Sequence, residues 1–98
     1  MAHFAHVLVG DQDAETAMQL VETLNKAGYK AYPVSDAKGL VGLGQSRRPD
    51  AMMVGNFTSP GQLDVVRQLR ETAETADIPV LMFNCDGSEK TRKATVEL

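Results

Sequence analysis

Short, continuous runs of apolar residues alternate along the chain with segments whose apolar residues recur every three or four positions. Three of these runs lie at residues 7–9, 51–54 and 80–83, bounded by glycine, proline, aspartate or asparagine. Continuous apolarity is typical of strands that are covered on both faces, as in a parallel sheet. A fourth candidate strand, residues 30–34, contains Pro33. Because proline cannot donate a hydrogen bond to a neighbouring strand, we expect this strand at a sheet edge.

The segment after the first strand has the periodicity of an amphipathic helix. We expect this helix to begin after Asp13, a favourable N-cap residue with Glu15 in the following turn, and to stop at Gly28. Its buried stripe is predicted to consist of Ala17, Leu20, Val21, Leu24 and Ala27.

Two further helices are predicted between the later strands. The second helix covers residues 37–46, with an inward face of Leu40, Val41 and Leu43. Glycines at 39, 42 and 44 each cost about 1 kcal/mol relative to alanine, so we expect this helix to be short or mobile. The third helix is predicted to begin with Ser59 as N-cap and Pro60 in the first turn. Its predicted buried stripe is Leu63, Val66, Leu69 and Ala73.

The last segment, residues 88–98, can be interpreted in two ways. Glu89 follows Asp86 by three positions, the spacing of a capping box, and Ala94 and Leu98 lie one turn apart, which favours a helix. Apolar residues at 94, 96 and 98 also alternate, as in a short strand. We favour the helix.

The resulting order, β-α-β-α-β-α-β followed by a helix, predicts one α/β domain over residues 1–98. Crossovers of this length require a doubly wound parallel sheet in three α/β/α layers. Ligand chemistry in such sheets gathers at the carboxyl ends of the strands. Three strand ends are therefore of interest: residues 11–13, 55–56 and 84–86.

At four places the sequence resembles the receiver domain of bacterial response regulators. The phrases are residues 7–13, 27–29, 47–54 and 76–83, which lie in the family's order. The resemblance covers essentially the whole chain and implies a flavodoxin-like fold with strand order 2-1-3-4. It also implies that the family's fifth strand and fifth helix are missing, because the sequence ends at Leu98.

In the family, a histidine kinase passes a phosphoryl group to an aspartate at the end of the third strand. Two acidic residues at the end of the first strand hold Mg²⁺, while a hydroxyl and a lysine bind the phosphoryl oxygens. Here the acceptor position falls on Gly55 when counted from Asp50, and on Asn56 when counted back from Pro60. Neither residue carries a carboxylate, so the resemblance implies a receiver without its phosphorylated aspartate.

The rest of the implied pocket is also altered. Asp11 matches one member of the acidic pair, but Gln12 replaces the other, and Asn84 stands at the hydroxyl position. The lysine has no counterpart that can be assigned. We therefore predict a vestigial pocket of Asp11, Gln12, Gly55, Asn56 and Asn84. It has no catalytic residue and no cofactor, and it holds Mg²⁺ only if the acidic site is retained. For Asp11, a carboxylate that accepts nearby backbone N–H groups is the favoured interpretation over a remnant metal ligand.

Composition excludes several functional classes. A net charge of −3 with scattered Lys and Arg argues against nucleic-acid binding. No stretch approaches the roughly 20 apolar residues of a membrane span, so no membrane contact is expected. The lone Cys85 is interpreted as a small buried side chain and, with no secretory signal visible, favours a reduced, cytoplasmic compartment. His3 and His6 lack companions for a metal site.

These observations favour a pseudo-receiver, a protein-interaction module of bacterial signalling that is not an enzyme. One alternative is an atypical phosphoacceptor with Mg²⁺ at Asp11 and Asp13 or Asp86 as nucleophile. The other is a small flavodoxin-like enzyme or ligand carrier, which the acidic loop after the first strand disfavours because it repels phosphates. A missing fifth strand leaves residues 80–83 at an open edge, which predicts self-association or completion by residues after Leu98.

Overall fold

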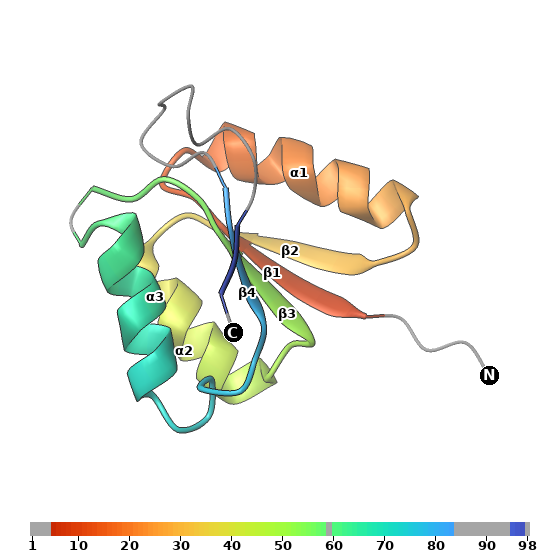
Figure 1. The fold of residues 1–98 in the computed structure, drawn as a ribbon. Coiled ribbons are helices and arrows are strands. Elements are labelled where there is room, and N and C mark those ends of the chain that lie inside the picture. The colour runs from red at the N-terminus through yellow and green to blue at the C-terminus, as the bar shows by residue number, and fades with distance from the viewer. Residues whose placement is uncertain (1–4, 59, 84–94, 98) are drawn as a thin grey trace.

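The computed structural model describes residues 5–58, 60–83 and 95–97, which form one sheet with helices on both faces (Figure 1). Its five strands lie in the order β2-β1-β3-β4-β5. In chain order the strands are β1 (His6–Gly10), β2 (Lys30–Val34), β3 (Ala51–Val54), β4 (Val80–Met82) and β5 (Thr95–Glu97). Strands β1 to β4 pair in parallel, whereas β5 pairs antiparallel with β4. The predicted parallel order 2-1-3-4 is confirmed, and so is the edge position of β2.

Helix α1 (Ala14–Lys26) has the predicted bounds because both of its ends are fixed by side-chain and backbone chemistry. The carboxylate of Asp13 accepts a hydrogen bond from the N–H of Glu15 at the first turn. After the helix, Gly28 takes a positive φ of 102°, a conformation that residues with a Cβ rarely adopt.

Helix α2 (Ala37–Arg47) matches the predicted range 37–46 to within one residue and is continuous over 11 residues, so its glycines have not shortened it. Gly44 explains part of this continuity, because it is buried where the helix crosses the sheet. A Cβ built on Gly44 would lie 2.9 Å from both Met52 Cε and Thr75 Cγ2. Glycine therefore allows a closer approach of the helix to the sheet, and the packing gained there offsets its low helix propensity.

Helix α3 (Gln62–Glu71) begins later than predicted, with Gly61 as its N-cap. The predicted cap, Ser59, lies outside the described residues. Thr58 and Gly61 form an isolated antiparallel bridge, which occupies the segment predicted as the first turn. The buried stripe also differs in part from the predicted one: Val65 is buried, whereas Leu63 is 64% exposed. Val66 and Leu69 are buried as predicted, and Ala73 is an exposed residue beyond the helix.

The prediction of a C-terminal helix was wrong for residues 95–97, which form β5; residues 88–94 lie outside the described residues. Thr95 pairs with Met82 and Glu97 with Val80. Pairing satisfies backbone groups of β4 that a helix would have left without partners. The parallel part of the sheet has four strands, as expected, and β5 is an antiparallel addition to it. Because β5 pairs with β4, the expectation of an open edge at β4 was wrong.

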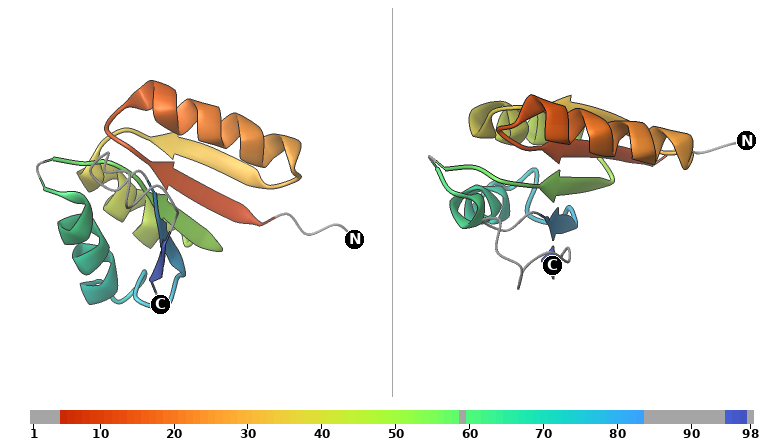
Figure 2. Two further views of the ribbon diagram at one scale, coloured as in Figure 1. Left: turned by 45° about the horizontal axis from the view of Figure 1, so that its top comes forward. Right: turned by 90° about the horizontal axis from the view of Figure 1, so that it is seen from above.

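The three helices form the two outer layers of the fold. In the view from above in Figure 2, α1 overlies β1 and β2, while α2 and α3 pack on the opposite face. The larger core lies under α2 and α3 and includes Leu8, Leu40, Met52 and Leu69. The smaller core lies under α1 and consists of Val7, Val9, Ala17, Val21 and Ala31.

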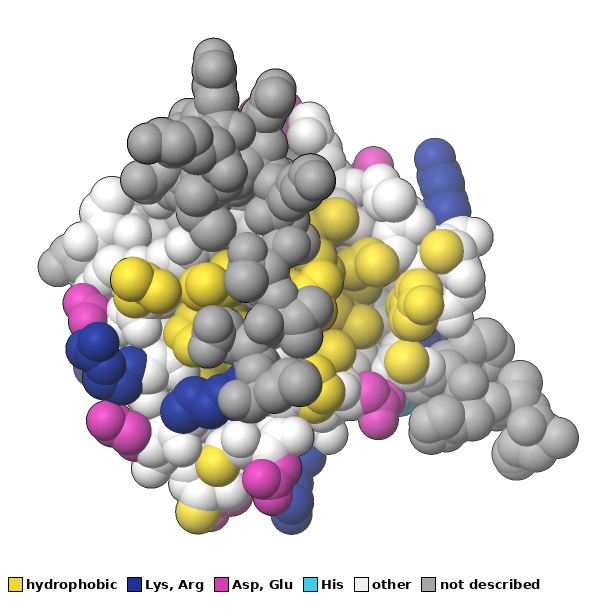
Figure 3. Space-filling view, in the orientation of Figure 1, with side chains coloured by type: hydrophobic (Ala, Val, Ile, Leu, Met, Phe, Trp, Pro, Cys, Tyr) yellow, Lys and Arg dark blue, Asp and Glu magenta, His cyan; other side chains and the backbone are white. Residues whose placement is uncertain are grey.

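Part of the α1 face is covered less completely than the rest of the sheet. Ala51, Met53 and Phe83 pack against the smaller core and remain partly exposed. Figure 3 shows hydrophobic side chains gathered over the strands near the middle of the molecule. None of the three helices in the described part of the chain is long and apolar enough to cross a membrane.

Candidate functional site

The ends of β1 and β3 bring together four of the five residues predicted for the vestigial pocket. Gly10 pairs with Val54 in the parallel register, so Asp11 and Gly55 are the next residues on the two adjacent strands. The N–H of Gly55 donates to the carbonyl of Gly10 at 2.7 Å, and the N–H of Gln12 donates to the carbonyl of Asn56 at 3.0 Å. The two loops that follow β1 and β3 are therefore joined by their backbones.

Asp11 is the most buried polar residue of this site, with 1% of its surface exposed. Its Oδ1 accepts the N–H of Asp13 at 2.8 Å, and its Oδ2 accepts the N–H of Asn56 at 3.0 Å. This is the arrangement that the sequence favoured, a carboxylate satisfied by backbone donors. Asp11 therefore holds the loop after β1 against the loop after β3.

Gly55 leaves no room for a side chain. A Cβ built on Gly55 would collide with Asp11 Oδ2 and would lie 2.6 Å from Phe83 Cζ. Asp11 is fixed by its two hydrogen bonds, so it cannot move aside without losing them. The volume that a side chain at position 55 needs is thus already occupied by a carboxylate and an aromatic ring.

Gln12 and Asp13 are also engaged in structural contacts. Gln12 Oε1 accepts two hydrogen bonds from Thr58, from its N–H at 3.0 Å and from its hydroxyl at 3.1 Å. Asp13 accepts the N–H of Glu15 at 3.2 Å and the hydroxyl of Thr16 at 2.8 Å. The assignment of Asp13 as a helix cap is confirmed.

One residue of this site was missed by the sequence analysis. Gln62 Nε2 donates to the carbonyl of Val54 at 3.0 Å and to the carbonyl of Phe83 at 2.9 Å. It thereby links the end of β3 to the end of β4. No pattern in the sequence marks Gln62, because its role depends on where the first turn of α3 lies relative to the two strands.

The remaining predicted residues are not placed. Asn84, Cys85 and Asp86 lie outside the described residues. Among the residues that are described, no group of three or more His, Cys, Asp and Glu side chains is positioned to hold a metal ion. The site thus consists of one buried carboxylate, one glycine and three amide side chains, an arrangement that binds loops together.

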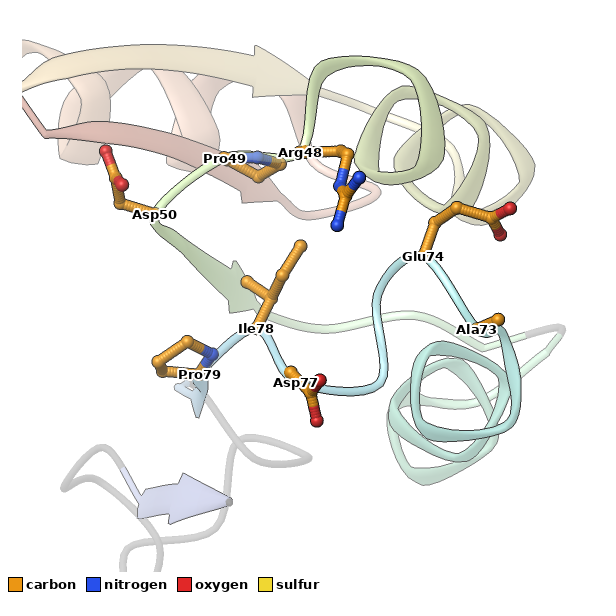
Figure 4. Close-up of a pocket in the computed structure, with 8 residues that line it drawn as sticks. All are labelled: Arg48, Pro49, Asp50, Ala73, Glu74, Asp77, Ile78 and Pro79. Carbon is orange, nitrogen blue, oxygen red and sulfur yellow. The ribbon is translucent and has the colours of Figure 1, made fainter.

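A separate cavity lies at the opposite end of the sheet, before β3 and β4 begin (Figure 4). It has a volume of about 280 Å³. Its lining comes from the loops that precede the two strands and consists of Arg48, Pro49, Asp50, Ala73, Glu74, Asp77, Ile78 and Pro79. The lining carries three carboxylates and one guanidinium, so the cavity does not favour an anion.

Comparison with known structures gives the class of protein that this fold defines: the chain has the flavodoxin-like receiver fold of response regulators. It superposes with a TM-score of 0.77 on the N-terminal domain of a response regulator receiver protein from Methanoculleus marisnigri, at 21% identity over 83% of this chain and 67% of that one. The chemotaxis protein CheY4 of Vibrio cholerae gives a TM-score of 0.76 at 23% identity, covering 83% of this chain and 68% of CheY4. A response regulator protein from Burkholderia multivorans gives 0.63 at 25% identity, covering 90% and 71%.

At the level of sequence, the chain is similar to the phosphate regulon transcriptional regulatory protein PhoB of Pseudomonas aeruginosa. The two are 23% identical over 94 residues, which is 94% of this chain and 41% of PhoB. The chain therefore spans about two fifths of that relative's length. No family model matches the sequence.

Proposed function

We propose that this chain is a degenerate member of the receiver family that acts in two-component signal transduction by binding other proteins. In this proposal it is not phosphorylated on aspartate and catalyses no reaction. The receiver fold and the similarity to PhoB support the assignment to signalling. The altered strand ends support the loss of phosphoryl chemistry.

The single observation that carries the proposal is the closed space at Gly55. The register with β1 makes Gly55, which directly follows β3 beside Asp11, the better candidate for the acceptor position. Even the first carbon of an aspartate side chain would collide there with Asp11 and Phe83. The pocket has thus lost the nucleophile and has also been filled.

The donor set does not fit Mg²⁺. Magnesium demands near-octahedral oxygen ligands and is usually held by one or two carboxylates with free lone pairs. Here Gln12 is neutral and its oxygen accepts two bonds from Thr58. Both oxygens of the buried Asp11 already accept backbone N–H groups. One fully buried carboxylate and one neutral amide, whose oxygen is already engaged, do not supply the set of oxygen ligands that Mg²⁺ prefers.

The test is to add Mg²⁺ and beryllofluoride to the ¹⁵N-labelled chain and record amide spectra, with an intact receiver domain as the positive control. We expect the spectrum of this chain to remain unchanged while that of the control shifts. A parallel incubation with a small phosphodonor should add no mass. Shifts centred on Asp11 and Asn56, or a hydroxylamine-sensitive phosphate, would contradict the proposal.

The phosphate measurement also tests the alternative of an atypical acceptor. Asp13 is poorly suited to be the nucleophile because its two carboxylate oxygens cap α1 through Glu15 and Thr16. Mapping any incorporated phosphate to Asp13 or Asp86 would favour that alternative. We further propose a cytoplasmic location, which rests on the lone cysteine. Self-association stays a prediction, although β5 has removed the open-edge argument for it.

A further inference from the structure

A second surface feature lies away from Asp11, near the start of β1 and β2. It is a niche of about 190 Å³ lined by His6, Leu8, Tyr32, Arg47 and Pro49. Leu8 belongs to the core under α2 and α3, and Tyr32 pairs with Leu8 in the parallel register. Both side chains therefore lie on the same face of the sheet. The niche forms where α2 ends, at Arg47, before it has covered this face completely.

Aromatic and cationic groups form an ordered wall on one side of the niche. The rings of His6 and Tyr32 are stacked, with centroids 6.4 Å apart and an angle of 27° between their planes. The guanidinium of Arg47 lies 5.6 Å from the centroid of the Tyr32 ring. These contacts orient the Tyr32 side chain although 39% of its surface is exposed.

The donor groups of this wall have no acceptor in the part of the chain that the structure describes. Neither the Arg47 guanidinium nor the Tyr32 hydroxyl forms a hydrogen bond or an ion pair there. The carboxylate of Asp50 is already used, since its Oδ2 accepts the backbone N–H of His6 at 2.8 Å. A positive guanidinium is thus available at this corner of a chain whose net charge is −3.

The size of the niche limits what it can hold. Ligand pockets usually measure about 300–1,000 Å³, so a niche of about 190 Å³ is too small for most cofactors. It is large enough for one side chain. Tyrosine and arginine are also among the residues enriched at the energetic centres of protein interfaces. Size and composition together favour a protein partner.

We propose that this niche binds an aromatic side chain of a partner protein next to an acidic residue of the same partner. The aromatic ring would pack mainly on the exposed ring of Tyr32, above the buried Leu8 and Pro49 at the base of the niche, and the acidic group would accept hydrogen bonds from Arg47. The proposal names a binding surface and a type of partner for the interaction module proposed above, and its biological role rests on that proposed function. The niche itself does not depend on the site at Asp11.

The probe is a short capped peptide, acetyl-Asp-Phe-Asp-amide, titrated into the full ¹⁵N-labelled chain. We expect saturable amide shifts confined to the surroundings of His6, Tyr32 and Arg47. Peptides with Lys in place of Asp, or Ala in place of Phe, should bind at least about fivefold more weakly, a difference of about 1 kcal/mol. The absence of saturable shifts, or equal binding of the Lys peptide, would overturn the proposal.

Variants of the chain test separately the recognition of the acidic residue and of the aromatic ring. Arg47→Gln should abolish the preference for the acidic peptide over the Lys peptide, and Tyr32→Ala should abolish the preference for Phe over Ala. Tyr29→Ala and Arg67→Gln remove an exposed tyrosine and an exposed arginine outside the niche and should leave binding unchanged. If these controls weaken binding as much as the niche variants do, the surface is not the one proposed.

Two other outcomes would also count against the proposal. Shifts at the niche that grow with protein concentration alone would show that a second copy of the chain fills it. Tight binding of free phenylacetate with no gain from the peptide would indicate a small-molecule site. The titration contains no phosphodonor, so its failure and a failure of the beryllofluoride experiment can be told apart.

Discussion

Replacing Gly55 with alanine tests the packing on which the proposed loss of phosphoryl transfer depends. The substitution adds one methyl group and no charge, so it isolates the steric effect from electrostatic effects. The new Cβ would collide with Asp11 Oδ2 and would lie 2.6 Å from Phe83 Cζ and 2.9 Å from Phe83 Cε2. Either the carboxylate or the ring has to move.

The structure sets the size of the expected effect. Overpacking of this kind typically costs about 1–3 kcal/mol. If Asp11 moves instead, its hydrogen bonds to the N–H groups of Asp13 and Asn56 weaken, and bonds to charged groups are worth about 1.5–3 kcal/mol each. Alanine also restricts the backbone of the unfolded chain more than glycine does, which stabilises the folded state by about 0.4–1 kcal/mol and offsets part of this loss. We therefore expect Gly55→Ala to lower the free energy of unfolding by about 2 kcal/mol.

Gly42→Ala is the matched control. A Cβ on Gly42 meets no atom within 4 Å, and the residue lies inside α2. Alanine is favoured over glycine in a helix, so this variant should be more stable than the parent by about 0.5–1 kcal/mol. The same chemical change is thus expected to have opposite signs at the two positions.

The assay is urea unfolding followed by circular dichroism. With a slope of about 2 kcal/mol/M, the midpoint of Gly55→Ala should fall by about 1 M. In the double variant with Asp11→Ala, the cost of Gly55→Ala should be smaller by at least about 0.5 kcal/mol than in the parent, because removing the carboxylate makes room for the new methyl group. If Gly55→Ala is as stable as the parent, or shifts in the same direction as Gly42→Ala, the space at position 55 is open and the reasoning is refuted.

Two further substitutions test other contacts. Gln62→Leu should lower the free energy of unfolding by about 1–3 kcal/mol, because it removes the donor shared by the carbonyls of Val54 and Phe83; urea unfolding measures this, and an unchanged midpoint would contradict the link between β3 and β4. Gly44→Ala should destabilise by about 1–2 kcal/mol despite its helix location, because its Cβ would lie 2.9 Å from Met52 Cε; a gain in thermal midpoint would show that α2 does not need this close approach.

The local pattern of the sequence was sufficient to predict most of the fold. Continuous apolar runs identified three of the four parallel strands, because strands covered on both faces need apolar side chains on both sides. Pro33 placed β2 at the edge, and Asp13 and Gly28 placed the ends of α1, because these residues act on their own backbone. Four of the five residues of the vestigial pocket could be brought together in advance for a similar reason: the ends of neighbouring parallel strands meet at one edge of the sheet.

Tertiary structure alone decided the features that depend on distant partners. Residues 95–97 form a strand because the edge of β4 is available to pair with them, which no local propensity reveals. The glycines suggested a weak α2, yet Gly44 lies where only a residue without a Cβ fits between the helix and the sheet. The filled space at Gly55 arises from the same cause. It is created by Asp11 and Phe83, which are 44 and 28 positions away in the sequence, and such non-local packing becomes visible only when the strands are side by side.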